Sequence, residues 1–505
     1  MRKYTDISTQ DPIDRPTWVD GIDNPYLHGP YTPVVSEVTA VDLKVNAGQV
    51  PDDLYGAYMR QGPNPIFEPK GPYHWFDGDG MVHGMYFRDG RASYIRKWTQ
   101  TRALHDEIEH GRVELSGIMG PYDISRVAGR ENAAMNPDYC KDTANTTLNL
   151  HNGKLLAAWY NSGHIHALDP LTLETTGEET FHGGLVTSLN AHGKVDVRTN
   201  EYINYGYADF QPWLTYYVIG AEGRVKHTAR IDLPGPRLPH DTTITPNYTI
   251  LHDFPLFHDP ALLSKTGHRI VQFRRDIPSR FGVMPRYGTQ AQVRWFEFEP
   301  GYVLHMVNAW EEGDEVVMVG TPYKIHLDDQ GQPDGKRLEK TIHNRQRDFM
   351  LYEWRFDLKT GQTRERCIDD VLNTEFPVIN SQYQGRKNRY SYNIIFAHGG
   401  KEEVRFPGLV KYDISAGSYV AYSAGPQFFY NEPGFAPRDN SQSEDDGYLV
   451  VLVWNPHEEQ SEIQIFDCKG AKMAEGPIAR VILPRRIPHG FHATFVSQTT
   501  LNRWK

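Results

Sequence analysis

The strongest constraint on the fold is a hairpin pattern that recurs along the chain. In this pattern an apolar, strand-like stretch ends at an acidic residue, a few turn residues follow, and another strand-like stretch begins. The acidic side chain can accept hydrogen bonds from turn backbone groups, and glycine supplies the positive φ that closes a hairpin. The pattern occurs at residues 165–177, 294–307, 352–366, 409–423 and 463–477.

Antiparallel hairpins repeated over the whole length are typical of a β-propeller, in which each blade is a small meander. A set of β-sandwiches has the same local pattern and is the alternative. Convincing amphipathic helices are scarce. We therefore predict an all-β propeller formed as a single domain by residues 41–505. Five prolines fall within residues 1–40, which are predicted to form an extended N-terminal arm.

Composition excludes several classes of protein. The net charge of −11 argues against a nucleic-acid partner. Cys140, Cys367 and Cys468 are too scattered for a disulfide framework or a zinc ribbon. Neither a secretory leader nor an apolar run of about 18 residues is recognisable. We expect a cytoplasmic protein, and peripheral contact with a membrane stays open.

Four histidines lie in separate strand-like stretches, which read NAHGKVD, RLPHDTTIT, YVLHMVNAWEEGDEVV and IPHGFHATF. Taken singly, each is better explained as a core histidine, because the chain contains 22 histidines. A metal bound by all four would be held from four distant parts of the chain, so that the fold itself would be the chelator. Imidazole suits iron, zinc, copper and nickel, and residue type alone therefore does not choose the metal.

Longer blocks of sequence resemble the carotenoid cleavage oxygenase family. They are GAYMRQGPNP, WFDGDGMVHG, the four histidine stretches, EFPVIN, and YNEPGFAPR followed by EDDGYLVVLVW, and they are spread across nearly the whole chain. The resemblance implies a seven-bladed β-propeller with an axial four-histidine iron site and a cap of loops and short helices over one face. It also implies oxidative cleavage of a conjugated carbon–carbon double bond by dioxygen.

The resemblance also implies the residues of the site. One Fe(II) ion per subunit would be bound by four ligands, His192, His240, His305 and His492. Glu375 and Glu432 match the family's glutamates that hold ligand histidines through their other ring nitrogen. Thr146, in TANTT, resembles a residue that crowds one open iron position. Iron and dioxygen supply the chemistry, and no catalytic acid or base is predicted.

Two departures from the family bear on the substrate. A third glutamate usually follows a GKLLA-like strand, whereas here the sequence GKLLAAWYNSG offers Trp159, Tyr160 and Asn161. One ligand histidine is therefore expected to hydrogen-bond an amide or a carbonyl in place of a glutamate. Trp159 and Tyr160 are predicted to line the substrate pocket. Stilbene-cleaving relatives place a lysine at this strand, but no lysine lies between Lys154 and Lys194.

The leading prediction is a non-haem Fe(II) dioxygenase that cleaves a carotenoid or apocarotenoid into two carbonyl products. The first alternative is a dioxygenase that cleaves a stilbene or phenylpropenoid, and a second is an isomerase of retinoid-like polyenes. An alternative of another class is an inactive propeller that binds a hydrophobic ligand or a protein partner. The sequence leaves the oligomeric state open.

Overall fold

The computed structural model describes residues 14–126, 139–209, 211–324, 348–399 and 403–502. The chain divides into two compact units, each described here by itself. Unit 1 comprises residues 1–126, 138–179 and 427–505, and unit 2 comprises residues 127–137 and 180–426. The described residues form seven antiparallel sheets of four to six strands, numbered here in chain order, and one two-stranded ribbon.

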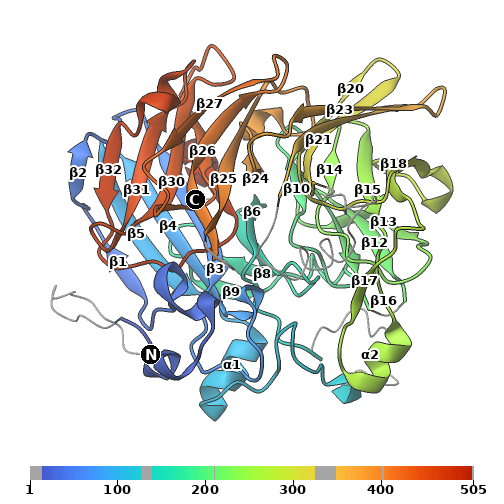
Figure 1. Cartoon of the computed structure of the whole chain (residues 1–505), viewed down its shortest axis with the longest axis horizontal. Helices are drawn as coiled ribbons and strands as arrows, with labels where there is room; N and C mark the ends of the chain where they lie inside the picture. Colours follow the sequence, from blue (N-terminus) through green and yellow to red (C-terminus); the bar gives the residue numbers. More distant parts are fainter. Residues whose placement is uncertain (1–13, 127–138, 210, 325–347, 400–402, 503–505) are drawn as a thin grey trace. The chain divides into compact units, whose positions relative to one another are not determined.

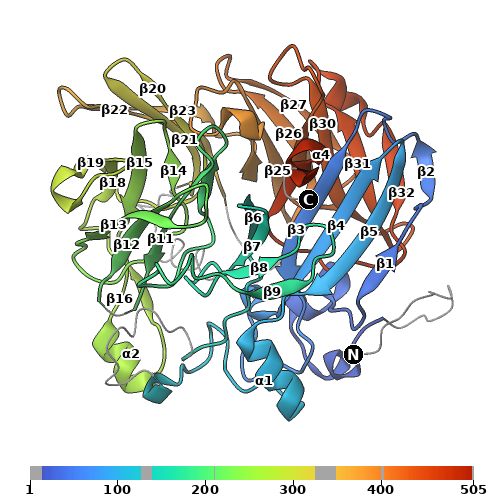
Figure 2. The same cartoon turned by 180° about the vertical axis from the view of Figure 1, so that it is seen from behind.

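Unit 1 contains three sheets, and two of them combine strands from both ends of the chain (Figures 1 and 2). Sheet 1 has the order β1-β5-β4-β3-β33, with β1 Val38–Ala40, β5 Arg91–Trp98, β4 Gly80–Arg88, β3 Gly56–Pro63 and β33 Ala493–Ser497. Sheet 2 is the meander β6 Thr147–His151, β7 Lys154–Ala158, β8 His166–Leu168 and β9 Thr175–Glu178. Sheet 7 has the order β2-β32-β31-β30-β28, with β2 Val45–Gly48, β32 Ala479–Ile482, β31 Gln460–Asp467, β30 Gly447–Asn455 and β28 Phe429–Tyr430, and β29 Gly434–Pro437 also pairs with β30.

Unit 2 contains four sheets that follow one another along the chain. Sheet 3 is β10 Lys194–Asp196, β11 Glu201–Tyr207, β12 Leu214–Ile219 and β13 Val225–Ile231, and sheet 4 is β14 Thr243–Ile244, β15 Tyr248–Asp253, β18 Ser279–Pro285 and β19 Arg294–Phe298. Sheet 5 is β20 Val303–Glu312, β21 Glu315–Pro322, β22 Leu351–Asp357 and β23 Thr363–Asp369, and sheet 6 is β24 Thr374–Val378, β25 Tyr390–Gly399, β26 Glu403–Asp413 and β27 Ser418–Ser423. The ribbon pairs β16 Leu256–His258 with β17 Val271–Phe273.

Four of the five predicted hairpin segments close hairpins within a single sheet. Their Asp carboxylates accept turn backbone N–H groups as expected; Oδ1 of Asp357, for example, lies 2.8 Å from the N–H nitrogens of both Lys359 and Thr360. The segment 294–307 differs, because β19 and β20 belong to different sheets, so it connects sheets instead of closing a hairpin. Its acidic residue is Glu299, whose longer side chain is less suited than Asp to forming the local turn.

Helices are few and short, as the sequence indicates. The α-helices of the described residues are α1 Arg102–His110, α2 Pro260–Thr266 and α4 Gln498–Asn502. The first two lie beyond the ends of the strands of their own units (Figure 1). Asp259 caps α2 through the N–H groups of the first turn, and Gly267 ends it at a φ of 73°. Among the described residues, no helix combines the length and apolar character needed to cross a bilayer.

The described part of the predicted N-terminal arm contributes buried side chains to unit 1. Residues 14–36 contain three short 3₁₀-helices, Thr17–Gly21, Pro25–Leu27 and Gly29–Tyr31. Val19, Leu27 and Val34 are fully buried within unit 1. Strand β1 then pairs with β5, so residues 38–40 already belong to sheet 1. Residues 1–13 of the arm lie outside the described residues.

The core lies between neighbouring sheets of each unit. In unit 1, Tyr58, Met85 and Tyr94 of sheet 1 pack against Val450 and Ile463 of sheet 7. In unit 2, sheets 3 and 4 form a comparable apolar layer, and so do sheets 5 and 6. Strands of these layers such as β11, β12 and β30 are buried along almost their whole length.

Candidate metal centre

Three of the predicted ligands lie at the edge strands of consecutive sheets in unit 2. His192 precedes β10, His240 precedes β14 and His305 lies near the start of β20. Each of these strands is the first of its meander. Each of the three histidines therefore lies at the start of its meander. Because the meander repeats from sheet to sheet, equivalent positions at the start of consecutive sheets come close together.

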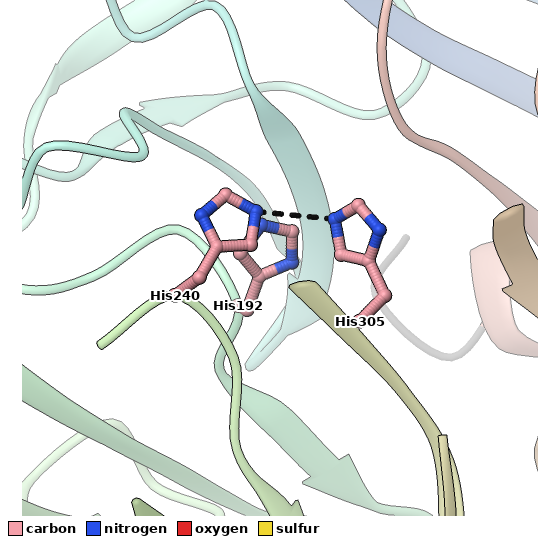
Figure 3. A group of neighbouring side chains, drawn as sticks. All are labelled: His192, His240 and His305. Carbon is pink, nitrogen blue, oxygen red and sulfur yellow. Dashed lines mark hydrogen bonds between the residues drawn. The ribbon is translucent and has the colours of Figure 1, made fainter. Parts of the chain in front are cut away.

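The three imidazoles converge on one point (Figure 3). One ligand nitrogen from each ring lies within 4.8 Å of the others, and all three side chains are buried. The ring centroids of His192 and His240 are 4.5 Å apart, and those of His240 and His305 are 4.9 Å apart. The Nε2 atoms of His240 and His305 face each other at 3.1 Å. The three histidines come from segments spread over more than 100 positions of the chain.

Glu375 fixes the tautomer of His305. Its carboxylate is fully buried in β24, and Oε2 lies 2.5 Å from Nδ1 of His305. A carboxylate accepts hydrogen bonds, so Nδ1 carries the proton and Nε2 presents its lone pair toward His240. Thr321 holds the other carboxylate oxygen, with Oγ1 at 2.6 Å from Oε1. The backbone N–H of Phe376 also donates to Oε2.

Backbone irregularities help to aim these side chains. The register of β20 against β21 shifts on both sides of His305, between Val303 and His305 and between Met306 and Asn308. Bulges of this kind redirect a side chain relative to the regular pleat. Phe376 has a φ of 53°, which is unusual for an aromatic residue and turns its N–H back toward the Glu375 carboxylate. The backbone at Phe376 is therefore strained directly beside the carboxylate that holds His305.

The donor set fits a transition-metal ion. Three buried imidazole nitrogens offer soft-to-borderline ligands, and one of them is backed by a carboxylate that raises its basicity. A lone pair aimed at a neighbouring imidazole nitrogen is unfavourable unless a proton or a cation lies between the two. The three histidines His192, His240 and His305 would therefore hold the iron that the family resemblance implies.

His492 and Glu432 belong to unit 1 and repeat the same design. His492 directly precedes the edge strand β33, and Glu432 lies between β28 and β29 of sheet 7. Nδ1 of His492 is 3.1 Å from both Glu432 oxygens, and the N–H of Ala493 donates to Oε2 at 2.5 Å. The histidine is therefore held as a donor at Nδ1, which leaves Nε2 as the acceptor.

The remaining predicted site residues also lie in unit 1. Thr146 precedes the edge strand β6, and its carbonyl accepts the backbone N–H of His492 at 3.2 Å. Its hydroxyl accepts the N–H of Tyr160 at 3.0 Å. Tyr160 packs against Phe76, with ring centroids 4.7 Å apart. Trp159 is fully buried, and its ring meets that of Tyr160 edge-on at a centroid distance of 5.9 Å.

Several residues that support the site carried no clear signal in the sequence. Thr321, which holds Glu375, lies in a β-strand with no distinguishing neighbours. Asn190 donates from Nδ2 to the carbonyl of His240 at 2.7 Å, and Asn204 in turn holds the carbonyl of Asn190 at 2.8 Å. The only available hint was a polar residue close before a histidine, as in NAHG.

Comparisons with known proteins identify the family. The family model described as retinal pigment epithelial membrane protein matches residues 31–497. The carotenoid 9,10(9',10')-cleavage dioxygenase of Crocus sativus is 36% identical across 95% of this chain and 90% of that protein. A carotenoid cleavage oxygenase of Mycobacterium tuberculosis is 30% identical across 94% of this chain and 98% of its own length.

Comparison with solved structures leads to the same family. The lignostilbene dioxygenase of Pseudomonas brassicacearum has a TM-score of 0.81 at 28% identity, covering 96% of this chain and all of that one. A variant of the Synechocystis apocarotenoid oxygenase has a TM-score of 0.79 at 26% identity, covering 93% and 98%. The predicted seven-bladed β-propeller is confirmed, with one of the seven sheets for each blade. The chain therefore belongs to the carotenoid cleavage oxygenase family of dioxygenases.

Proposed function

We propose that this chain is a non-haem Fe(II) dioxygenase that cleaves an internal conjugated double bond of a carotenoid or apocarotenoid into two carbonyl products. The observation that carries the proposal is the convergence of His192, His240 and His305, with Glu375 behind His305, in a chain of this family. An inactive scaffold would have no need to keep three buried imidazoles facing one another.

We propose one ferrous ion per subunit, with His492 as the fourth ligand. The support for His492 is its Glu432 partner, which fixes Nδ1 in the way that Glu375 fixes His305. Ferrous iron bound by neutral imidazoles would supply the redox chemistry that couples dioxygen to cleavage of the alkene. Thr146, bonded through its carbonyl to the His492 backbone, is proposed to limit access beside that ligand.

The protein's own contribution is orientation and the exclusion of water. Glu375 and Glu432 keep a proton on Nδ1 of their histidines, so that each Nε2 stays available as a ligand atom. The three histidines of unit 2 are each less than a tenth exposed, and water is therefore largely excluded from the ligand atoms. None of these residues needs to move a proton to the substrate.

The curated relatives support a carotenoid-type substrate. Proteins named carotenoid 9,10(9',10')-cleavage dioxygenase are 34–36% identical to this chain over at least 94% of its length. In unit 1, Tyr160, Phe76 and Phe491 form a row of aromatic rings, with centroids of Phe76 and Phe491 5.0 Å apart. We propose that Tyr160, backed by Trp159, contacts the substrate, because aromatic faces suit a flat conjugated chain.

The test is turnover by protein reconstituted with Fe(II) under air. Apocarotenals, carotenoids and hydroxystilbenes are offered separately, oxygen uptake is recorded, and carbonyl products are identified by mass spectrometry. We expect two carbonyl products from a carotenoid or apocarotenoid, with one dioxygen consumed per cleavage. Isomerised polyene without oxygen uptake would instead indicate an isomerase. Absence of turnover together with failure to retain iron would indicate a binding protein.

The stilbene alternative has support of its own in the similarity to a lignostilbene dioxygenase structure. It predicts that removing the para-hydroxyl of a hydroxystilbene abolishes cleavage. The absence of any lysine between Lys154 and Lys194 argues against it, because no ammonium group is available there to engage the phenol. Turnover confined to hydroxystilbenes would overturn the carotenoid proposal.

His492→Ala tests the fourth ligand. We expect the purified variant to retain less than one iron per subunit and to lose cleavage activity, while its circular dichroism stays that of a β-protein. His164→Ala, at a partly exposed histidine of unit 1, is the matched control. Full iron content and full activity in His492→Ala would exclude His492 from the ligand set.

Peripheral contact with a membrane follows from the proposed substrate, which partitions into lipid. Co-sedimentation of the protein with phosphatidylcholine vesicles tests this, with the supernatant fraction in the absence of vesicles as the control. Recovery of all protein in the supernatant at saturating lipid would contradict it.

A further inference from the structure

One buried carboxylate connects all three histidine segments of unit 2. Asp241 is 1% exposed. Its Oδ1 accepts Nζ of Lys194 at 2.5 Å and the N–H of Thr242 at 2.7 Å, whereas its Oδ2 accepts the N–H of Met306 at 2.8 Å. The two oxygens therefore serve different parts of the chain.

Each of these partners is a close neighbour of a histidine in the metal centre. Lys194 follows His192 by two residues, Met306 directly follows His305, and Asp241 itself directly follows His240. The backbone of Asp241 is also bridged to that of His192 in a parallel β-bridge. The Asp241 carboxylate is thus the point at which the three histidine-bearing segments meet.

The position of Asp241 is itself fixed by its backbone. Its carbonyl accepts the hydroxyl of Tyr205 at 3.0 Å and a hydrogen bond from Nε2 of His252. Tyr205 lies in sheet 3, and His252 lies in sheet 4. The carboxylate is therefore anchored to the two sheets that carry His192 and His240, while its Oδ2 reaches the third.

We infer that Asp241 is a positioning residue that holds His192, His240 and His305 in the arrangement that binds iron. This inference rests on the proposed function, because it concerns the affinity of that same centre. Asp241 need not touch the metal. It acts by keeping three segments in register, and residues that orient metal ligands without touching the metal contribute roughly ten- to a hundredfold to metal affinity.

A carboxylate is needed at position 241 because both of its oxygens accept hydrogen bonds. In Asp241→Asn a single amide oxygen can serve either the Lys194 and Thr242 side or the Met306 side. The amide group then turns its own N–H toward a donor on the other side. The substitution changes shape very little, so its effect reports the loss of one tie between segments and the loss of charge beside Lys194.

The experiment measures Fe(II) affinity of the full-length protein anaerobically, by competition with a chromophoric chelator, together with Co(II) absorption spectra and thermal unfolding of the metal-free protein. Asp241→Asn is compared with Asp209→Asn as the matched control. Asp209 is an equally buried carboxylate of unit 2 whose ion pairs are with Arg269 at 2.6 Å and His258 at 2.9 Å. We expect Asp241→Asn to lower iron affinity by roughly ten- to a hundredfold and to shift the Co(II) spectrum. Asp209→Asn should lower the unfolding temperature and leave both metal readouts unchanged.

Lys194→Met provides a second variant in case Asp241→Asn fails to fold. It removes only the tie to the His192 segment, and we expect a smaller loss of affinity than in Asp241→Asn. Wild-type affinity in either folded variant, or an equal loss in Asp209→Asn, would overturn the role of Asp241. If wild-type protein binds no iron, or if His305→Ala binds it as tightly as wild type, the proposed function fails instead, and the two failures are thereby distinguished.

Discussion

Replacing Glu375 gives the sharpest test of how the protein prepares the metal centre. The carboxylate is fully buried and accepts hydrogen bonds from His305, Thr321 and Phe376. In Glu375→Gln, the amide oxygen can face His305 and Phe376 while the amide N–H donates to Thr321, whose hydroxyl still reaches the His305 carbonyl at 3.1 Å. Every partner stays bonded, and only the charge is lost.

The magnitudes follow from this difference. A charge-assisted hydrogen bond contributes about 1.5–3 kcal/mol and a neutral one about 1 kcal/mol. Loss of about 1.4 kcal/mol corresponds to about tenfold in affinity, which is our expectation for Glu375→Gln. In Glu375→Ala the His305 Nδ1–H and the Phe376 N–H lose their acceptor, so the His305 tautomer is no longer held. We expect iron affinity to fall about a hundredfold and the free energy of unfolding to fall by about 2–4 kcal/mol.

The assay is anaerobic titration of metal-free protein with Fe(II), combined with urea unfolding of the same samples. Glu353→Gln is the matched control, because Glu353 is a buried glutamate of the same unit that binds Arg355 and Arg366 and makes no bond to a histidine. It should leave iron affinity unchanged. Equal iron affinity in wild type, Glu375→Gln and Glu375→Ala would refute the reasoning, and so would an equal loss in both Glu375 variants.

Two further predictions concern stability. Burial lowers the pKa of His252 to about 4. The free energy of unfolding that depends on neutral His252 is therefore fully present above the unfolded pKa of about 6.5 and is lost as the pH falls toward 4. At pH 5 the loss in unfolding free energy is about 2 kcal/mol. His252→Gln keeps a donor toward the Asp241 carbonyl but cannot titrate, so urea unfolding of metal-free protein should lose that part of its pH dependence, and identical pH profiles would contradict the assignment. In Gly490→Ala, the new Cβ would lie 1.5 Å from Nη1 of the fully buried Arg60. We expect a loss of about 2–3 kcal/mol in unfolding free energy and weaker iron retention through the neighbouring ligand segment, whereas Gly21→Ala, with open space around it, should be neutral; wild-type stability in Gly490→Ala would contradict the packing argument.

The sequence predicted the fold class well because hairpin signals are local. An Asp that satisfies its own turn, as at Asp357, acts within a few residues and is visible in one short window. The pattern was misleading at 294–307, where the same signals mark a connection between sheets 4 and 5. Whether a strand returns to its own sheet or starts the next depends on burial of whole sheet faces, which no short window contains.

At the site, family blocks pointed to ligand histidines and to glutamates that hold them, but not to which glutamate meets which histidine. Glu375 reaches His305 across 70 positions, and Thr321 reaches Glu375 across 54. Asp241 has no recognisable signal in the sequence, because its role depends on Lys194 and Met306, which lie on two other sheets. The prediction for Trp159 and Tyr160 as pocket residues stays a prediction, and the Trp159 side chain is fully buried.

The sequence by itself determined that this chain is a β-protein built from repeated hairpins, and its family blocks named histidines and glutamates of a metal site. Turn chemistry and side-chain identity are properties of neighbouring residues, and they can be read locally. Only the tertiary structure decided that three of the named histidines meet in unit 2, which nitrogen of His305 carries its proton, and that one aspartate ties three segments together. These features depend on register between consecutive sheets, which is set by the packing of their buried faces and not by any single stretch of sequence.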